Sequence, residues 1–241
     1  RKATFLSGSN DMPPGAAQET LAVSWAMAFG VEDINGFNSL QPRRYTDYLY
    51  GTKVSDVSYG FLANPALLQP SSPILPALNV RYLLVLVDMK QPLIGPQFRQ
   101  IYRSREVRVF ENTLVWPRAF FAASARSEND PAAVLSAVTA PGFDARQTSL
   151  VEGALPRDLA TGAGASSASV TSQSPNRLEI AASTDAPRLL VVSEMFFPGW
   201  RATIDGAEVP ILRTNYLFRG VVVPPGAHTV VFEYRPLMAM F

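Results

Sequence analysis

The chain has 241 residues, of which 47% are hydrophobic, and its 21 Lys and Arg residues nearly balance its 20 Asp and Glu residues. This apolar content is enough for a hydrophobic core in one large domain or two smaller ones, which argues against a disordered chain. A net charge of +1 provides no strong positive electrostatic potential that could bind a phosphate backbone, so we expect no nucleic-acid partner. With no Cys and one His, the chain excludes disulfide frameworks, zinc ribbons, thiol nucleophiles and two-imidazole sites within one chain, and we expect neither a metal nor a cofactor.

The two ends of the chain indicate a piece of a longer protein. No stretch approaches the roughly 20 consecutive apolar residues of a membrane-spanning helix. The chain opens on Arg1-Lys2-Ala3 without a visible signal peptide, and residues 236–241 turn apolar. We therefore expect a hydrophobic segment to follow the chain in the full-length protein.

The first 80 residues predict short helices and a long connection. Good helix formers at 18–29, followed by Gly30, predict a short buried helix. Tyr45 and Tyr48 lie three residues apart, so a helix there would place them on one side. Four prolines within 64–79 exclude a long helix and indicate a draped connection.

The next segment predicts a sheet with at least one covering helix. Residues 80–87 form a nearly continuous β-favouring apolar run, typical of a strand buried on both faces. Asp130 followed by Pro131 predicts the start of a helix that continues to Val138. Further strands are expected at 98–102, 107–110, 119–123 and 148–151. We therefore predict an α+β domain over residues 1–160.

The composition changes after residue 160. Residues 160–169 are small, uncharged residues typical of a flexible linker. Asp205-Gly206 between two β-rich runs is the sharpest hairpin signal in the chain, because both central residues of that turn favour positive φ. Short strands are expected at 177–182, 188–193, 200–204, 208–212, 217–223 and 229–234. Closely spaced strands without helices between them predict an antiparallel β-sandwich over residues 167–241.

The titratable residues favour structural roles over catalysis. His228 has the pKa of a natural general base, but it begins a predicted strand and no nearby serine has a nucleophile context. Asp205, Glu208, Glu233 and Glu194 could supply a carboxylate pair for sugar hydrolysis. The hairpin turn already accounts for an aspartate at position 205. The alternation of side chains along the predicted strands would place the three glutamates on the solvent-exposed face. A hydrogen-bonded strand histidine and solvated carboxylates are the favoured interpretation, with a hydrolase as the alternative.

Aromatic and basic residues near the predicted turns are candidates for binding. Exposed aromatic rings hold sugar rings or partner surfaces through apolar contact beside a polar handle. Arginine side chains can hold an anionic group. Core and strand-edge packing is the alternative role for the same residues. The candidate contacts for a glycan or a partner are Phe197, Trp200, Arg213, Tyr216, Arg219 and His228.

Two motifs go beyond composition: FPGWxAxIDG over residues 197–206 and RGVxVPxGxH over residues 219–228. In this order, with the flanking segments 174–180 and 232–236, they resemble the C-terminal extracytoplasmic region of YfhO-type bacterial membrane proteins. Weaker similarities upstream extend the resemblance over most of the chain and lie at 36–40, 78–82 and 111–120.

This resemblance implies a polytopic membrane protein related to the GT-C glycosyltransferases, which take sugars from polyprenyl-phosphate carriers. The catalytic acid of that superfamily lies in an early loop between membrane helices, upstream of this region, so no catalytic residue is carried over. We therefore expect a non-catalytic, extracytoplasmic accessory domain, tethered to the membrane, that assists acceptor or glycan binding in envelope glycosylation. Its expected partners are its own transmembrane region and a glycan or polyprenyl-linked sugar. A structural or assembly domain packing on membrane helices, and a free-standing carbohydrate-active hydrolase, are the alternatives.

Overall fold

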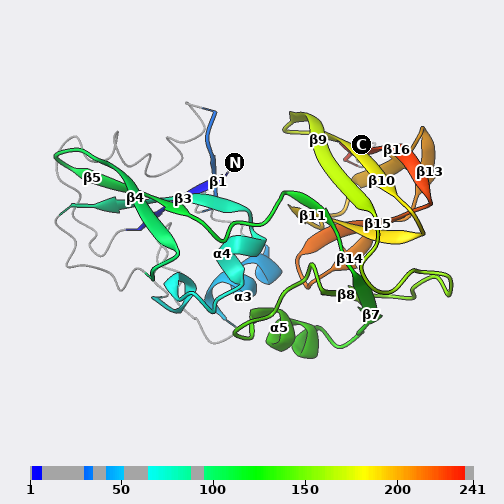
Figure 1. The fold of residues 1–241 in the computed structure, drawn as a ribbon, viewed down its shortest axis with the longest axis horizontal. Helices are drawn as coiled ribbons and strands as arrows, with labels where there is room; N and C mark the ends of the chain where they lie inside the picture. Colours follow the sequence, from blue (N-terminus) through cyan, green and yellow to red (C-terminus); the bar gives the residue numbers. More distant parts are fainter. Residues whose placement is uncertain (1, 7–29, 35–41, 52–64, 88–94, 237–241) are drawn as a thin grey trace, which may run out of the picture. The chain divides into compact units, whose positions relative to one another are not determined.

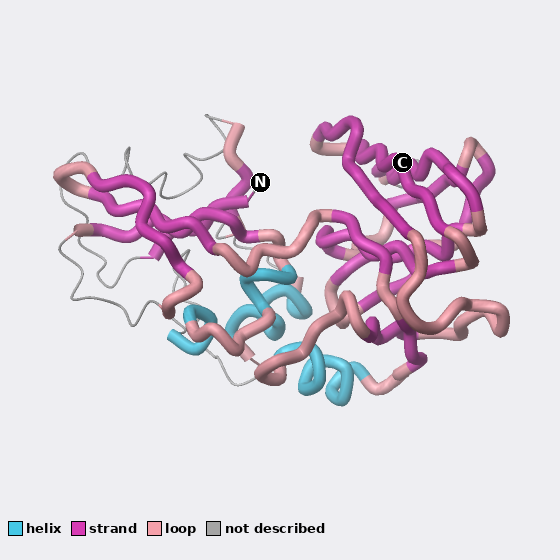
Figure 2. Tube along the Cα trace, viewed as in Figure 1, coloured by secondary structure: helices cyan, strands magenta, loops and turns pink. Residues whose placement is uncertain are grey.

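The computed structural model describes residues 2–6, 30–34, 42–51, 65–87 and 95–236 (Figure 1). Strands predominate over helices in these residues, so the fold is a β-rich α+β fold (Figure 2). The chain divides into two compact units. Unit 1 comprises Arg1–Trp116 and Thr139–Gly142, and unit 2 comprises Pro117–Val138 and Phe143–Phe241. The helix expected at 18–29 and the apolar residues 237–241 lie outside the described residues.

Unit 1 is built on a five-stranded mixed sheet in the order β2-β1-β3-β5-β4. Its central strand β3 pairs in parallel with β1 and antiparallel with β5. Neighbouring residues Leu83 to Leu86 of β3 are all buried, which confirms the expected strand with two covered faces. The strands are β1 (Lys2–Leu6), β2 (Glu32–Asp33), β3 (Val80–Leu86), β4 (Phe98–Arg103) and β5 (Val107–Asn112).

The described helices of unit 1 are short. Helix α3 (Arg43–Tyr50) forms where the tyrosine spacing allowed one, and it buries Tyr48 and Leu49. The proline-rich segment forms only the single turns η1 (Pro65–Leu68) and α4 (Ile74–Ala77), as the proline spacing requires. Within the described ranges, no helix has the length and apolar character needed to cross a membrane.

Unit 2 contains two sheets. The first is antiparallel throughout, with the order β13-β12-β16-β10-β9, and the second has the order β6-β11-β15-β14-β8-β7. In the second sheet only β7 and β8 pair in parallel. The strands of the first sheet are β9 (Ser166–Ser174), β10 (Arg177–Thr184), β12 (Trp200–Ile204), β13 (Ala207–Val209) and β16 (Gly226–Tyr234). Those of the second are β6 (Ala119–Phe121), β7 (Ser124–Ser127), β8 (Thr148–Glu152), β11 (Arg188–Met195), β14 (Leu212–Thr214) and β15 (Phe218–Val223).

The helix expected from Asp130 onward is confirmed as α5 (Pro131–Thr139). Asp130 Oδ1 accepts a hydrogen bond from the Ala132 amide at 3.0 Å, and the Asp130 carbonyl accepts one from Val134 at 2.9 Å. The side chain therefore satisfies a donor that the first helical turn leaves without a partner.

The structure differs from the sequence prediction in the region of residues 160–169. Most of the serine-rich half of the expected linker belongs to strand β9, which pairs with β10 along its length. Backbone pairing needs no apolar side chains, so an edge strand with mostly exposed small residues leaves little hydrophobic signal in the sequence. The units also divide at Trp116 and Pro117 and not near residue 160, because strands β6, β7 and β8 pair into a sheet with later strands.

Both sheets of unit 2 contribute side chains to one hydrophobic core. The alternating inward residues of β10 and β16, such as Ile180 and Phe232, meet those of β11 and β15, such as Leu190 and Val221. All four of these side chains are fully buried. Phe121, Trp200 and Ile211 are partly buried residues that pack against this cluster, and Trp200 leads to the site described next.

Candidate functional site

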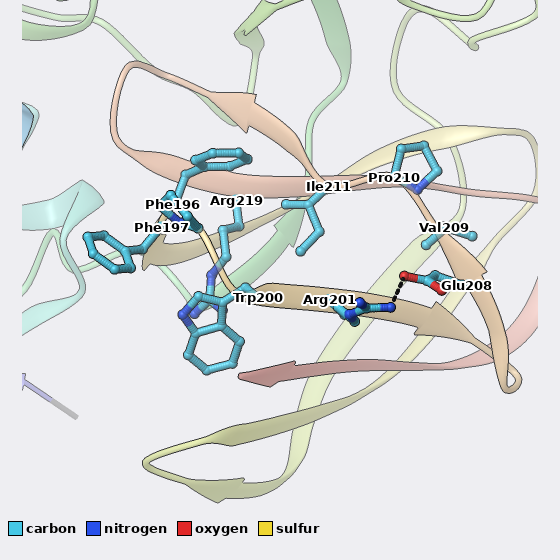
Figure 3. Close-up of a pocket in the computed structure, with 10 residues that line it drawn as sticks. Phe196, Phe197, Trp200, Arg201, Glu208, Val209, Pro210, Ile211 and Arg219 are labelled. Atoms are coloured by element: carbon cyan, nitrogen blue, oxygen red, sulfur yellow. Dashed lines mark hydrogen bonds and ion pairs between the residues drawn. The ribbon is translucent and has the colours of Figure 1, made fainter. Parts of the chain in front are cut away.

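A pocket of about 250 Å³ lies beside this core in unit 2 (Figure 3). Its walls come from the segment between β11 and β12, from β12 and β13, from the segment after β13, and from β15. Figure 3 shows the Arg219 side chain reaching the Trp200 indole, and the dashed line marks an ion pair between Arg201 and Glu208. The lining residues are Phe196, Phe197, Pro198, Trp200, Arg201, Glu208, Val209, Pro210, Ile211 and Arg219.

The tight connection from β11 to β12 positions the aromatic wall. The Phe196 amide donates a hydrogen bond to the Leu217 carbonyl at 2.7 Å, which ties this connection to the turn before β15. Gly199 has a φ of 96°, and a Cβ atom there would lie 2.8 Å from the Tyr234 ring. Only glycine fits both conditions without strain. The connection thus places Phe197, which is 43% exposed, beside Trp200 at the start of β12.

Arg219 connects the two sheets of unit 2. Arg219, Val221 and Val223 are spaced two residues apart on β15, so their side chains point to the same face of the sheet. The side chains of Val221 and Val223 belong to the core. Its guanidinium carbon lies 3.7 Å from the centre of the Trp200 ring and 5.3 Å from that of Phe232, both of which belong to the other sheet. A guanidinium over aromatic rings is held by cation–π attraction that strengthens when water is excluded.

The charge on Arg219 is almost fully buried, because only 2% of the residue is exposed. Burial lowers the pKa of Arg219 to about 10, while the nearby negative charge of Glu194 acts in the opposite direction. The guanidinium therefore remains protonated at neutral pH. Its Nε and Nη1 atoms are buried without a hydrogen-bond partner in the structure. Buried donors without a partner cost free energy, because they have lost their bonds to water.

The structure brings together some of the residues that the sequence singled out. Phe197, Trp200 and Arg219 line the same pocket. Arg213 lies outside the lining, with its guanidinium carbon 4.3 Å from the centre of the Phe196 ring, which is part of the wall. Tyr216 does not line this pocket and is only 5% exposed, so its ring is part of the protein interior.

Sequence reasoning missed the wall that follows β13. Glu208 to Leu212 had been expected to form one strand, but Pro210 separates β13 from β14, and residues 209–211 line the pocket. Proline lacks the amide donor of a continuous strand ladder, so Pro210 was the available signal for this break. That the break would lie opposite Trp200 depends on the tertiary fold.

His228 lies outside the pocket lining and holds two turns of unit 2. Its Nδ1 lies 2.6 Å from Asp205 Oδ2, and its Nε2 lies 3.1 Å from the Pro225 carbonyl oxygen. Asp205 and Gly206 have φ values of 51° and 87° between the paired strands β12 and β13, which confirms the predicted hairpin. Asp205 Oδ1 also accepts a hydrogen bond from the Thr229 amide at 2.8 Å. The interpretation of His228 as a hydrogen-bonded strand residue agrees with these contacts.

These contacts predict a pH-dependent contribution to stability. The hydrogen bond to Asp205, with that to Pro225, raises the pKa of His228, and the same bond to His228 lowers the pKa of Asp205. The histidine contribution is complete below its unfolded pKa of about 6.5 and is lost as pH rises through the raised folded pKa. The aspartate contribution is complete above its unfolded pKa of about 3.9 and is lost as pH falls through the lowered folded pKa. We expect the difference in Tm between the wild type and His228→Gln to be largest between about pH 4 and pH 6.5.

Thermal denaturation of both proteins across a pH series tests this expectation. The difference in Tm should shrink toward high pH and toward low pH. A difference that stays constant across the series would show that the imidazole is not protonated against Asp205.

The carboxylates considered for hydrolysis have other partners. Glu208 pairs with Arg201 at 3.2 Å, and Glu233 pairs with Arg235 at 2.6 Å. Glu194 lies 3.5 Å from Arg118. Within the part of the chain that the structure describes, no group of three acidic or histidine side chains is arranged to hold a metal ion. The pocket lining combines aromatic rings, the buried Arg219 guanidinium and the Arg201–Glu208 ion pair.

Comparison with known proteins adds no assignment: the chain matches no family model, no curated protein and no solved structure at a significant level.

Proposed function

We propose that this chain is a non-catalytic binding module that takes a glycan into the Trp200 pocket. In this proposal the module is the extracytoplasmic accessory domain of a YfhO-like membrane protein and assists glycan or acceptor binding during envelope glycosylation. Its partners are the transmembrane region of the full-length protein and a glycan or polyprenyl-linked sugar.

The observation that carries the proposal is that both motifs behind the resemblance meet at one pocket. The motif at 197–206 supplies Trp200 and the aromatic connection, and the motif at 219–228 supplies Arg219. Their two key side chains are 19 positions apart in sequence, yet the guanidinium carbon lies 3.7 Å from the indole centre. Motif residues that converge on a cavity favour a role in binding over a role in packing alone.

The chemistry of the pocket supports a sugar as its ligand. Binding sites for small molecules combine apolar walls with a few polar groups that set orientation. Trp200 and the partly exposed Phe197 offer apolar surface for the carbon face of a sugar ring. Arg201 and Glu208 at the wall offer donors and acceptors for hydroxyl groups.

A titration of the nitrogen-15-labelled chain tests the proposal. Neutral, uronate-bearing and phosphate-bearing oligosaccharides are added while the indole N–H resonance of Trp200 is followed. We expect at least one class to shift this resonance with saturation. Trp200→Ala should weaken binding by about tenfold or more, since stacking on an aromatic ring contributes on the order of 1 kcal/mol beyond its buried area.

Tyr102→Ala is the matched control, because Tyr102 is an aromatic residue 57% exposed on β4 of unit 1. The affinity of the Tyr102→Ala variant for the same oligosaccharide should equal that of the wild type. If no oligosaccharide of the three classes shifts the Trp200 resonance, the glycan proposal is overturned and a structural or assembly role takes its place.

We also propose that the two sheets of unit 2 form a β-sandwich. Support comes from the core cluster, to which inward side chains of both sheets contribute. Two sheets that bury their apolar faces against each other are the usual arrangement of such strands.

A further inference from the structure

We propose that the ligand of the Trp200 pocket carries an anionic oxygen group, a carboxylate or a phosphate, which accepts hydrogen bonds from Arg219. This inference rests on the proposed function and narrows it to acidic or phosphorylated sugars. Carboxylate and phosphate share the required chemistry, since both present several negatively charged acceptor oxygens.

Part of the hydrogen-bonding capacity of Arg219 is unfilled. A guanidinium has five N–H donors and no acceptor. Here both Nε and Nη1 are buried without a hydrogen-bond partner. Arg219 lines the pocket, and only 2% of the residue is exposed. An oxygen ligand in the pocket would provide acceptors that the protein itself does not.

The charge balance around the pocket also favours an anionic ligand. Three other arginines of unit 2 pair with a carboxylate, whereas Arg219 has no ion pair within the described part of the chain and is opposed by the negative charge of Glu194 alone. Among the described residues, no carboxylate lies within ion-pair distance of Arg219. The three ion pairs are Arg201 with Glu208, Arg118 with Glu194, and Arg213 with Glu152. Because Glu194 also faces the guanidinium of Arg118, it offsets only part of the positive charge of the two arginines. A ligand with a negative charge completes the balance.

An apolar residue could occupy the position of Arg219 in the core. A buried charge without a partner costs free energy, and even a buried ion pair can often be replaced by apolar residues of similar volume without loss of stability. The neighbours Val221 and Val223 show that this face of β15 accepts apolar side chains. Packing alone therefore does not require a charge at this position, whereas recognition of an anion does.

Isothermal titration with three matched disaccharides tests the inference. The probes are cellobiose, cellobiouronic acid, in which a carboxylate replaces one hydroxymethyl group, and cellobiose 6-phosphate. We expect the wild-type chain to bind at least one charged probe about tenfold or more tightly than cellobiose, as hydrogen bonds to a charged partner predict. Whichever charged probe is preferred identifies carboxylate or phosphate as the recognised group.

Two variants test the role of the guanidinium. Arg219→Met keeps an unbranched apolar side chain about as long as the aliphatic stem of arginine and removes the guanidinium with its charge, and this variant should bind charged and neutral probes equally. Arg219→Lys keeps the charge and should retain part of the preference. Arg177→Met is the matched control, because it removes one charge from the partly exposed Arg177–Glu179 pair on β10 and should keep the full preference. Thermal denaturation of each variant verifies that it is folded.

The outcomes separate this inference from the proposed function. Equal affinities of the wild type for charged and neutral probes overturn the inference and leave glycan binding intact. A preference for charged probes that persists in folded Arg219→Met also overturns it, because the anion then binds elsewhere. If no disaccharide and no oligosaccharide binds, both proposals are overturned together.

Discussion

Replacing Phe232 with alanine is expected to reduce the free energy of unfolding of unit 2 by about 3–5 kcal/mol, the usual cost of removing a buried aromatic ring. Phe232 is fully buried in the core cluster, and its ring also lies 5.3 Å from the Arg219 guanidinium carbon. The substitution therefore leaves a cavity between the sheets and removes one of the two rings beside the buried cation. A decrease in Tm of about 10 °C or more is expected from calorimetry.

Phe197→Ala is the control for this experiment, since it removes the same ring from the same unit at a position that is 43% exposed. We expect this control to change the free energy of unfolding by less than about 1 kcal/mol. Equal losses in the two variants would contradict the assignment of Phe232 to the shared core.

Asn215→Ala is expected to reduce the free energy of unfolding by about 3 kcal/mol, because it leaves buried groups without partners and places alanine in the left-handed region. Asn215 is 1% exposed and has a φ of 48° in the turn between β14 and β15. Its Oδ1 accepts a hydrogen bond from the Leu150 amide at 2.8 Å, and its Nδ2 donates one to Ser149 Oγ at 3.1 Å. Its own amide also donates to the Leu150 carbonyl at 2.7 Å, so this residue connects β8 to the turn.

Asn215→Gly separates the two contributions. Glycine tolerates positive φ, so this variant should recover about 1 kcal/mol of the loss while the side-chain hydrogen bonds remain absent. Asn176→Ala, at an exposed asparagine in the β9–β10 turn, is the control and should change stability by less than about 0.5 kcal/mol. A Tm for Asn215→Ala within about 1 °C of the wild-type value would contradict the structural role assigned to this side chain.

Local patterns in the sequence were sufficient for most individual strands. The apolar run of β3, the capped helix after Asp130 and the Asp205-Gly206 hairpin are all where the sequence placed them. Each depends on interactions between residues that are close in the chain, such as a side-chain cap or a turn that requires positive φ. Strand β9 was missed because its exposed serines carry no periodic hydrophobic signal, and its ladder with β10 is made by the backbone.

The candidate site was predicted only in part. Aromatic residues beside turns and arginines on strands are visible in the sequence, and three of the six candidates line the pocket. Tyr216 carries the same aromatic signal as Trp200, yet it is buried in the interior. Exposure of a turn residue depends on what packs over it, which a single chain segment does not specify.

Composition and local patterns could indicate a β-rich protein without cysteine, in which aromatic residues and arginines lie near the predicted turns of the last third. Only the tertiary structure placed the Arg219 charge on the Trp200 ring, beside a cavity and without a carboxylate of its own among the described residues. The physical reason is that strand alternation sets which face a side chain occupies, whereas the pairing of distant strands sets which residues share that face. The pairing of β15 with its neighbours thus buries the Arg219 guanidinium and leaves its Nε and Nη1 donors without a hydrogen-bond partner.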